Sequence, residues 1–335
     1  MRRITLALTV ALLCSAVVPT TTATNAALAD GAEARKLTWQ KSDTSVALLN
    51  NGHVVWQHDH DRKAGKPSMS IHLLDGTELT RPWPFPANYP RNDHVWHKGL
   101  WWSWKGIDGI NFWEEHQEGT DPTAVATKLS DDGSARIEMT ISYHVPDGPP
   151  LATEKRIIEV SAPDRAGSYM IDWQAEFAPG GDKPVVFNRN GYGGLAIRFA
   201  ADFAGEPPKE PNAWTFIKSA EQAGDEAMKP AGNRWMAYAG KAQNGRPTCI
   251  AMFDHPDNPR YPTQWAVRTQ YPYLNPAFTA SRQDYTLQPG QKLKLRYGIL
   301  IHAGPGDTDA LEKAWKSFAG GIGPAWHRTG DDCHQ

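Results

Sequence analysis

The sequence predicts an all-β protein: a large antiparallel β-sandwich with one C-terminal helix. Three observations predict it. Apolar and polar residues alternate over long stretches, turn-forming residues separate these stretches, and one segment near the C-terminus has helical periodicity. Alternation with a period of two describes a strand with one buried face. Many such strands followed by a single helix are typical of two packed antiparallel sheets.

The clearest strands are three long alternating segments. In "ARIEMTISYHV" every second residue from Ile137 to Val145 is apolar, and residues 169–177 and 291–301 repeat the pattern. Shorter strand candidates lie near residues 46–58, 68–74, 193–200, 234–240 and 247–254. Residues 78–95, 105–124 and 202–232 read as long loops. Residues that favour tight turns separate the strands: Asn50-Asn51-Gly52, Asp75-Gly76, Asp131-Asp132-Gly133, Asp147-Gly148 and Pro289-Gly290.

The helix is predicted in "TDALEKAWKSFAGG", residues 308–321. Asp309 and Glu312 fit an N-terminal capping arrangement, and Gly320 can end the helix. The helical period places four apolar side chains on one face: Leu311, Ala314, Trp315 and Phe318.

The N-terminus has the pattern of an export signal. Two arginines follow Met1, an apolar run extends from residue 6 to 18, and Ala27-Leu28-Ala29 offers a cleavage site. The apolar run is too short to span a membrane comfortably. We therefore expect a signal peptide at 1–29, one sandwich domain at 30–322 and a mobile tail at 323–335, in a periplasmic or extracellular protein.

Composition narrows the function classes. The 335 residues carry a formal net charge of −2, which disfavours nucleic acid as the main partner because phosphate binding needs a basic surface. The chain has no Gly-x-Ser-x-Gly elbow, no P-loop and no zinc-ligand quartet. No cofactor is predicted, although a divalent metal remains an alternative.

The segment "NDHVWHKGLWWSWKGIDGINFWEE", residues 92–115, contains two candidate proton-transfer groups, His94 and His97. A metal would need a third ligand such as His255, so a metal-free pair is the main hypothesis. Glu114 and Glu115 close the segment. A carboxylate beside tryptophans can have a raised pKa and act as a general acid. The alternative is that both are exposed loop acids.

Five of the 14 tryptophans lie in this segment. Indole faces suit the apolar faces of sugar rings, so Trp101 and Trp102, with Tyr192, are candidates for a saccharide platform. Asp93 and Lys98 would supply polar contacts to the same ligand. The alternative is core packing, because indole buries a large area.

A second candidate cluster is "FDHPDNPRYPTQWAVRTQYPYLNPAF", residues 253–278. Its prolines predict a stiff, shaped loop. His255 is the third candidate proton-transfer residue. Arginine and tyrosine suit a polar or anionic ligand, and the candidate substrate contacts here are Asp254, Arg260, Arg268, Tyr271 and Asn275.

Several motifs together resemble the bacterial PmoA-like family. They are "DGTELTRPWPFP", "DHVWHKGLWWSW", "GINFWEE", "GYGGLAIRF", "FDHPDNPRYPTQWAVR", "YLNPAF" and "LKLRYGILIH". That family carries the label methane oxygenase PmoA and is otherwise a domain of unknown function. Val95-Trp96 and Lys98 stand where many members have Pro-His and Arg, which removes one histidine. The resemblance implies a sandwich similar to galactose mutarotase and a role in saccharide degradation. A literal methane oxygenase is not expected, because no membrane span follows the signal.

The sequence thus predicts an exported carbohydrate-active protein that binds a saccharide or glycoside. The leading hypothesis is an enzyme that acts on glycosides or modified sugars by histidine and carboxylate acid-base chemistry. One alternative is a non-catalytic glycan-binding protein. Another is a metal-dependent hydrolase or lyase with His94, His97 and His255 as ligands.

Overall fold

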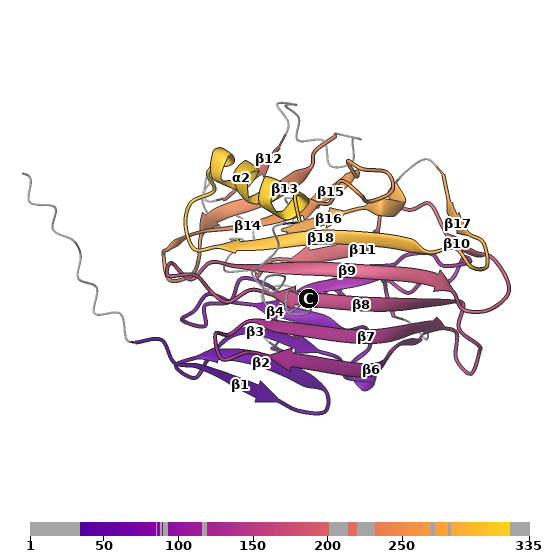
Figure 1. Cartoon of the computed structure of the whole chain (residues 1–335), viewed down its shortest axis with the longest axis horizontal. Coiled ribbons are helices and arrows are strands. Elements are labelled where there is room, and N and C mark those ends of the chain that lie inside the picture. The colour runs from indigo at the N-terminus through magenta and orange to yellow at the C-terminus, as the bar shows by residue number, and fades with distance from the viewer. Residues whose placement is uncertain are drawn as a thin grey trace, which may run out of the picture. The chain divides into compact units, whose positions relative to one another are not determined.

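Two eight-stranded antiparallel sheets pack face to face, as Figure 1 shows. The structure is a computed structural model that describes residues 34–84, 86–87, 89, 93–115, 119–200, 214–219, 232–268, 272–280 and 283–321, without the side chains of 214, 215 and 218. Within these residues the predicted all-β sandwich with one C-terminal helix is confirmed. The predicted signal peptide and tail lie outside the described residues.

Sheet 1 contains, in spatial order, β1 (Leu37–Lys41), β2 (Ser45–Asn50), β3 (His53–Asp59), β4 (Ser68–Ile71), β5 (Leu100–Trp104), β11 (Gly193–Arg198), β16 (Tyr273–Pro276) and β15 (Trp265–Arg268). Sheet 2 contains β12 (Trp214–Lys218), β13 (Trp235–Lys241), β14 (Pro247–Asp254), β18 (Leu293–His302), β9 (Tyr169–Pro179), β8 (Ala152–Val160), β7 (Ala135–His144) and β6 (Gly119–Leu129). A separate pair joins β10 (Val185–Phe187) to β17 (Tyr285–Leu287). The helical elements are η1 (Arg62–Ala64), η2 (Phe278–Ala280) and α2 (Thr308–Ala319).

The alternating segments form strands where the sequence predicts them. Strands β7, β9 and β18 match the three long segments, and the candidate at 46–58 divides at the turn Asn51-Gly52 into β2 and β3. Two predicted loops were wrong in part, since 105–124 contains the start of β6 and 202–232 contains β12.

The core lies between the two sheets. Trp102 and Leu195 of sheet 1 are fully buried there with Trp173 and Ile299 of sheet 2. Because side chains alternate along a strand, the residues next to these point to the outer faces. Each sheet therefore has an outer face that something else covers or that solvent reaches.

Helix α2 covers part of the outer face of sheet 2, where its residues Leu311 and Phe318 join a cluster from β13 and β14. Asp307 caps the helix by accepting a hydrogen bond from the Ala310 N–H (2.8 Å), so the predicted cap at Asp309 and Glu312 was wrong. Gly320 ends the helix as predicted. No helix in the described ranges is long and apolar enough to cross a membrane.

Candidate functional site

Aromatic and titratable side chains gather on the outer face of sheet 1. Trp101 on β5 and Tyr273 on β16 point outward, opposite to their core-facing neighbours, and form one buried cluster. Residues 93–97 and Trp113 lie against this cluster. We call this region the aromatic face and define it by Asp93–His97, Trp101, Trp113, Tyr192, Arg198, Arg268 and Tyr273.

His97 lies at the centre of the aromatic face and is 1% exposed. Its ring stacks with those of His94, Trp101 and Tyr273, at centroid distances of 4.9, 4.8 and 5.3 Å. Burial, followed by the charge of Arg198, holds the pKa of His97 well below its ordinary value. His97 is therefore neutral near pH 7 and cannot serve there as a proton donor in the imidazolium form.

Asp93 and His94 form an oriented pair at the surface. The Asp93 Oδ2 atom lies 3.3 Å from His94 Nδ1, and both side chains are 34% exposed. The Asp93 Oδ1 atom lies 3.4 Å from Arg198 Nη2 and 3.9 Å from Arg81 Nη1. Both arginines are buried. A carboxylate anchored beside a histidine in this way is an arrangement found in acid-base catalytic sites.

The backbone of the pair is unusual. His94 has a φ of +46°, in the left-handed region that side chains other than glycine adopt infrequently. Arg81 Nη1 donates to the carbonyl oxygens of Asp93 (2.7 Å) and His94 (3.1 Å), which holds this turn in place. Strained backbone of this kind is concentrated at functional sites.

The solvent-accessible aromatic surface belongs to Trp96 and Tyr192, which are both partly exposed. The Trp96 ring meets the His94 ring edge to face at 5.4 Å. Arg268 Nη2 donates to the Tyr192 hydroxyl (2.8 Å), and its guanidinium lies 5.7 Å from the centre of the Tyr192 ring. The predicted contacts Asp93, Tyr192 and Arg268 therefore lie on one face with His94.

Two predicted platform residues are buried instead. Trp102 packs in the sandwich core, with ring centroids 5.7 Å from Phe177 and 5.5 Å from Tyr297. Trp101 points to the correct face but is fully buried beneath His97. The difference arises because consecutive residues of a strand point to opposite faces, so Trp101 and Trp102 could not both reach a ligand.

The two glutamates are counter-ions of lysines. Glu115 Oε2 lies 3.0 Å from Lys66 Nζ and 2.9 Å from Lys98 Nζ, and both lysines are buried. Burial alone would raise the pKa of Glu115, but Lys66 and Lys98 outweigh it and hold that pKa below its ordinary value. Glu114 is bound by Lys105. The predicted raised pKa of Glu115 was wrong, and Lys98 turns inward rather than toward a ligand.

The second predicted cluster is divided: Arg268 lies on the aromatic face, but His255 lies on the other side of the sandwich. His255 is 3.4 Å from Arg296 Nη1 and its ring centroid is 5.3 Å from that of Phe318 in α2, on the outer face of sheet 2. Asp254 is buried, and its carboxylate accepts from Asn258 Nδ2 and the Thr263 N–H, both at 2.7 Å. Burial raises its pKa to about 7.

His255 therefore cannot join His94 and His97 at one site, and the three-histidine metal hypothesis is not supported. Across the described ranges, no three His, Cys, Asp or Glu side chains are grouped as a metal site would require.

The remaining predicted contacts shape the loops. Arg260 donates to three backbone carbonyls within residues 278–284. Asn275 is fully buried and its amide donates to the backbone of β11. Tyr271 lies outside the described residues.

Three contributors to the aromatic face did not emerge as site residues from the sequence: Arg81, Arg198 and Lys66. Arg198 could have been predicted from the sequence, because a lone arginine ends the otherwise apolar strand "GGLAIR". No local pattern marks Arg81 or Lys66, since their roles depend on contacts with residues 93–94 and 113–115.

A family description matches residues 45–316, which is most of the sequence. The chain belongs to the family of unknown function DUF6807. The matched description carries no methane-oxygenase label, so the PmoA designation remains a resemblance. No curated protein matches this DUF6807 chain.

Two solved structures are similar to this DUF6807 protein in part. An α-galactosidase from Lactobacillus brevis has 11% identity and a TM-score of 0.39, and the alignment covers 81% of this chain and 40% of that one. A polysaccharide lyase has 13% identity and a TM-score of 0.33, with 84% and 34% covered. The DUF6807 chain thus spans well under half the length of either protein.

Proposed function

We propose that this protein is an exported carbohydrate-active enzyme that moves a proton on a bound sugar with the Asp93–His94 pair. The observation that supports the proposal most directly is the position of His94. It is one-third exposed, lies 3.3 Å from a carboxylate that two buried arginines hold, and touches the accessible indole of Trp96.

The roles of the residues follow from these positions. A sugar ring lies with its apolar face on Trp96 and Tyr192, and the Arg268 guanidinium donates to a ring substituent. His94 accepts a proton from the substrate through Nε2, the nitrogen that faces away from Asp93. Asp93 stabilises the resulting imidazolium, while Arg81 and Arg198 keep Asp93 in place.

The reaction class follows from the state of the glutamates. Glycoside hydrolysis usually needs two carboxyl groups on either side of the scissile bond, one of them protonated. Glu114 and Glu115 are each bound to lysine, so neither suits the protonated role. Removal of one proton by His94 fits the face better than two-carboxylate hydrolysis does: in an elimination the leaving oxygen departs and takes a proton from solvent, and in an isomerisation His94 returns the proton to a neighbouring atom.

A non-catalytic glycan-binding role is the second candidate. It is favoured by the Trp96 and Tyr192 surfaces, which can hold a sugar without any titration. In that case His94 would contribute contacts alone.

The test uses the intact protein with defined oligosaccharide series: cello-, xylo- and galacto-oligosaccharides as neutral probes and oligogalacturonides as acidic probes. Products are followed by mass spectrometry and by the ultraviolet absorbance of unsaturated sugars. We expect one series to be converted by the wild type and not by His94→Ala, with binding retained. Binding without conversion by the wild type would favour the second candidate. Binding that survives Trp96→Ala unchanged would contradict both.

Export is tested separately. N-terminal sequencing of protein recovered from outside the cytoplasm should start near Asp30, and an intact Met1 would contradict export.

A further inference from the structure

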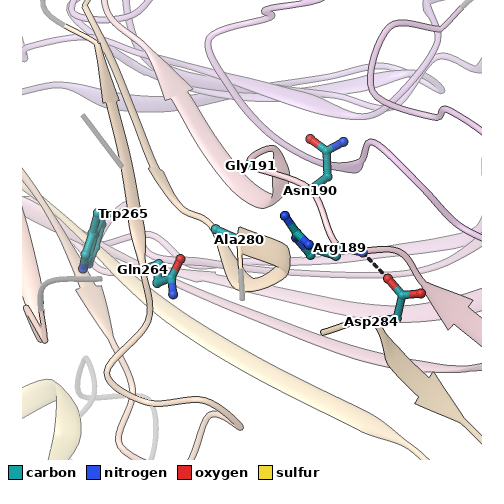
Figure 2. A pocket seen from close by; sticks show the side chains of 7 residues that line it. All are labelled: Arg189, Asn190, Gly191, Gln264, Trp265, Ala280 and Asp284. Atoms are coloured by element: carbon teal, nitrogen blue, oxygen red, sulfur yellow. Dashed lines mark hydrogen bonds between the residues drawn. The ribbon is translucent and has the colours of Figure 1, made fainter. Parts of the chain in front are cut away.

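A pocket of about 550 Å³ lies beside the aromatic face (Figure 2). Its volume falls within the range of roughly 300–1,000 Å³ that is typical of small-molecule sites. In Figure 2, Gln264 and Trp265 lie across Ala280 from the segment 189–191. The pocket is lined by Arg189, Asn190, Gly191, Gln264, Trp265, Ala280 and Asp284.

Most polar side-chain groups of this pocket form no hydrogen bond with another described residue. The Arg189 guanidinium, the Asn190 Nδ2 amide and the Gln264 side-chain amide have no hydrogen-bond partner among the described residues. Within the described part of the chain, Asp284 Oδ1 accepts one hydrogen bond, from the Arg189 backbone N–H (2.6 Å). The pocket therefore offers several donors and one carboxylate. Sugar hydroxyl groups both donate and accept, so this mixture suits them.

The pocket walls are fixed in place. Asn190 Oδ1 accepts from the Tyr192 N–H (3.1 Å), and the Asn190 N–H donates to the Thr279 carbonyl (2.9 Å). Trp265 Nε1 donates to the Asn233 carbonyl (2.8 Å). A lining that is held before the ligand arrives loses less conformational entropy on binding.

The pocket and the aromatic face adjoin at two places. Gly191 lines the pocket and the next residue, Tyr192, belongs to the aromatic face. Ala280 lines the pocket and also packs on the aromatic-face cluster. A ligand that extends past Tyr192 would therefore enter the pocket.

We propose that this pocket is a second saccharide subsite, so that the substrate is an oligosaccharide with one unit on Trp96 and Tyr192 and a further unit in the pocket. This inference rests on the proposed function. Arg189, Asn190, Gln264 and Asp284 bind the hydroxyl groups of the second unit. The subsite contributes affinity for longer ligands and takes no part in proton transfer.

The test measures affinity against ligand length. The wild type, Arg189→Ala, Gln264→Ala and the double variant are titrated by calorimetry with one-, two-, three- and four-unit members of the cello-, xylo-, galacto- and galacturono-series. Arg165→Ala is the matched control, because Arg165 is an exposed arginine outside the pocket. Thermal unfolding verifies that each variant is folded.

We expect wild-type affinity to rise about tenfold or more between the one-unit and longer ligands, which corresponds to about 1.4 kcal/mol. In the double variant that gain should fall to under about threefold, with one-unit affinity and the control unchanged. An undiminished gain in the double variant, with binding still dependent on Trp96, would overturn the subsite alone. Absence of binding by any series to the wild type would overturn the proposed function and the subsite with it.

Discussion

The outer faces of the two sheets carry similar residues in different arrangements. Each has a histidine whose pKa is lowered by burial first and by a neighbouring arginine second: His97 beside Arg198, and His255 beside Arg296. On sheet 2 the buried Asp172 forms an ion pair with Arg296, whose Nη2 lies 2.6 Å from Asp172 Oδ2. The carboxylate paired with His255 is that of Asp257, at 3.7 Å and 92% exposed.

On sheet 1, by contrast, one carboxylate contacts both arginine and histidine. Asp93 lies within 4 Å of two arginines through one oxygen and 3.3 Å from His94 through the other. Residue types alone therefore do not make an acid-base site. The arginine must anchor the carboxylate and still leave an oxygen for an accessible histidine.

The largest expected effect is on turnover, and it tests which of the two outer faces carries the active site. His94→Ala should lower turnover by about 10²- to 10⁴-fold, the usual contribution of a positioned acid or base. His255→Ala should change turnover by less than about threefold, because His255 lies on the other face. Both variants are compared by initial rates on the converted oligosaccharide series, with unfolding curves as a folding control.

The reverse ranking, with His255→Ala inactive and His94→Ala active, would move the site to sheet 2. The pocket of about 300 Å³ that His255 lines there with Arg296 and Asn258 would then be the candidate.

The next effect concerns stability and compares a tryptophan of the core with one of the aromatic face. Trp102→Ala should lower the free energy of unfolding by about 3–5 kcal/mol, because it empties a fully buried indole site in the core. Trp96→Ala should lower it by under about 1 kcal/mol, since Trp96 is partly exposed. Urea unfolding measures both. Equal losses would mean that Trp96 is a structural residue and not a ligand platform.

The sequence predicted the fold better than the site, for a physical reason. Alternation and turn residues are local, so β7, β9 and β18 could be located without any knowledge of their neighbours. The side of the sandwich on which a strand lies is not local. His255 ends up opposite His94 because β14 belongs to sheet 2 and β5 to sheet 1.

The chemistry of a single residue is equally non-local. Tryptophan neighbours in the sequence suggested a raised pKa for Glu115, but the residues that decide its pKa are Lys66, 49 positions earlier, and Lys98. By contrast, His94 and Asp93 are adjacent in sequence, and their pairing is of the kind that sequence reasoning can reach.

A smaller effect on stability tests the packing around Glu115, which forms ion pairs with Lys66 and Lys98. Gly65 has a φ of +88°, and an added Cβ would collide with Glu115 Oε1. Gly109 has a φ of +80° with no atom near such a Cβ, so it is the matched control. Gly109→Ala should cost about 1 kcal/mol through backbone strain alone, and Gly65→Ala about 2–3 kcal/mol. Equal costs in urea unfolding would show that Glu115 moves aside freely.

The smallest effect is a pH dependence of stability that differs between the two faces. His97 stays neutral in the folded protein because burial and Arg198 lower its pKa, whereas in the unfolded chain it takes up a proton near pH 6.5. The unfolded state then binds more protons, so the free energy of unfolding falls as the pH drops below about 6.5, by up to about 1.4 kcal/mol per pH unit.

His97→Phe should reduce that slope between pH 6.5 and 5, and His255→Phe should reduce it less, because the pKa of His255 is lowered less. The remaining slope in both variants includes contributions from buried histidines elsewhere, such as His58, and an opposite contribution from Asp254, whose raised pKa of about 7 makes the folded state bind a proton that the unfolded state does not. Urea unfolding at closely spaced pH values measures it, and an unchanged slope in His97→Phe would mean that His97 takes up a proton in the folded state.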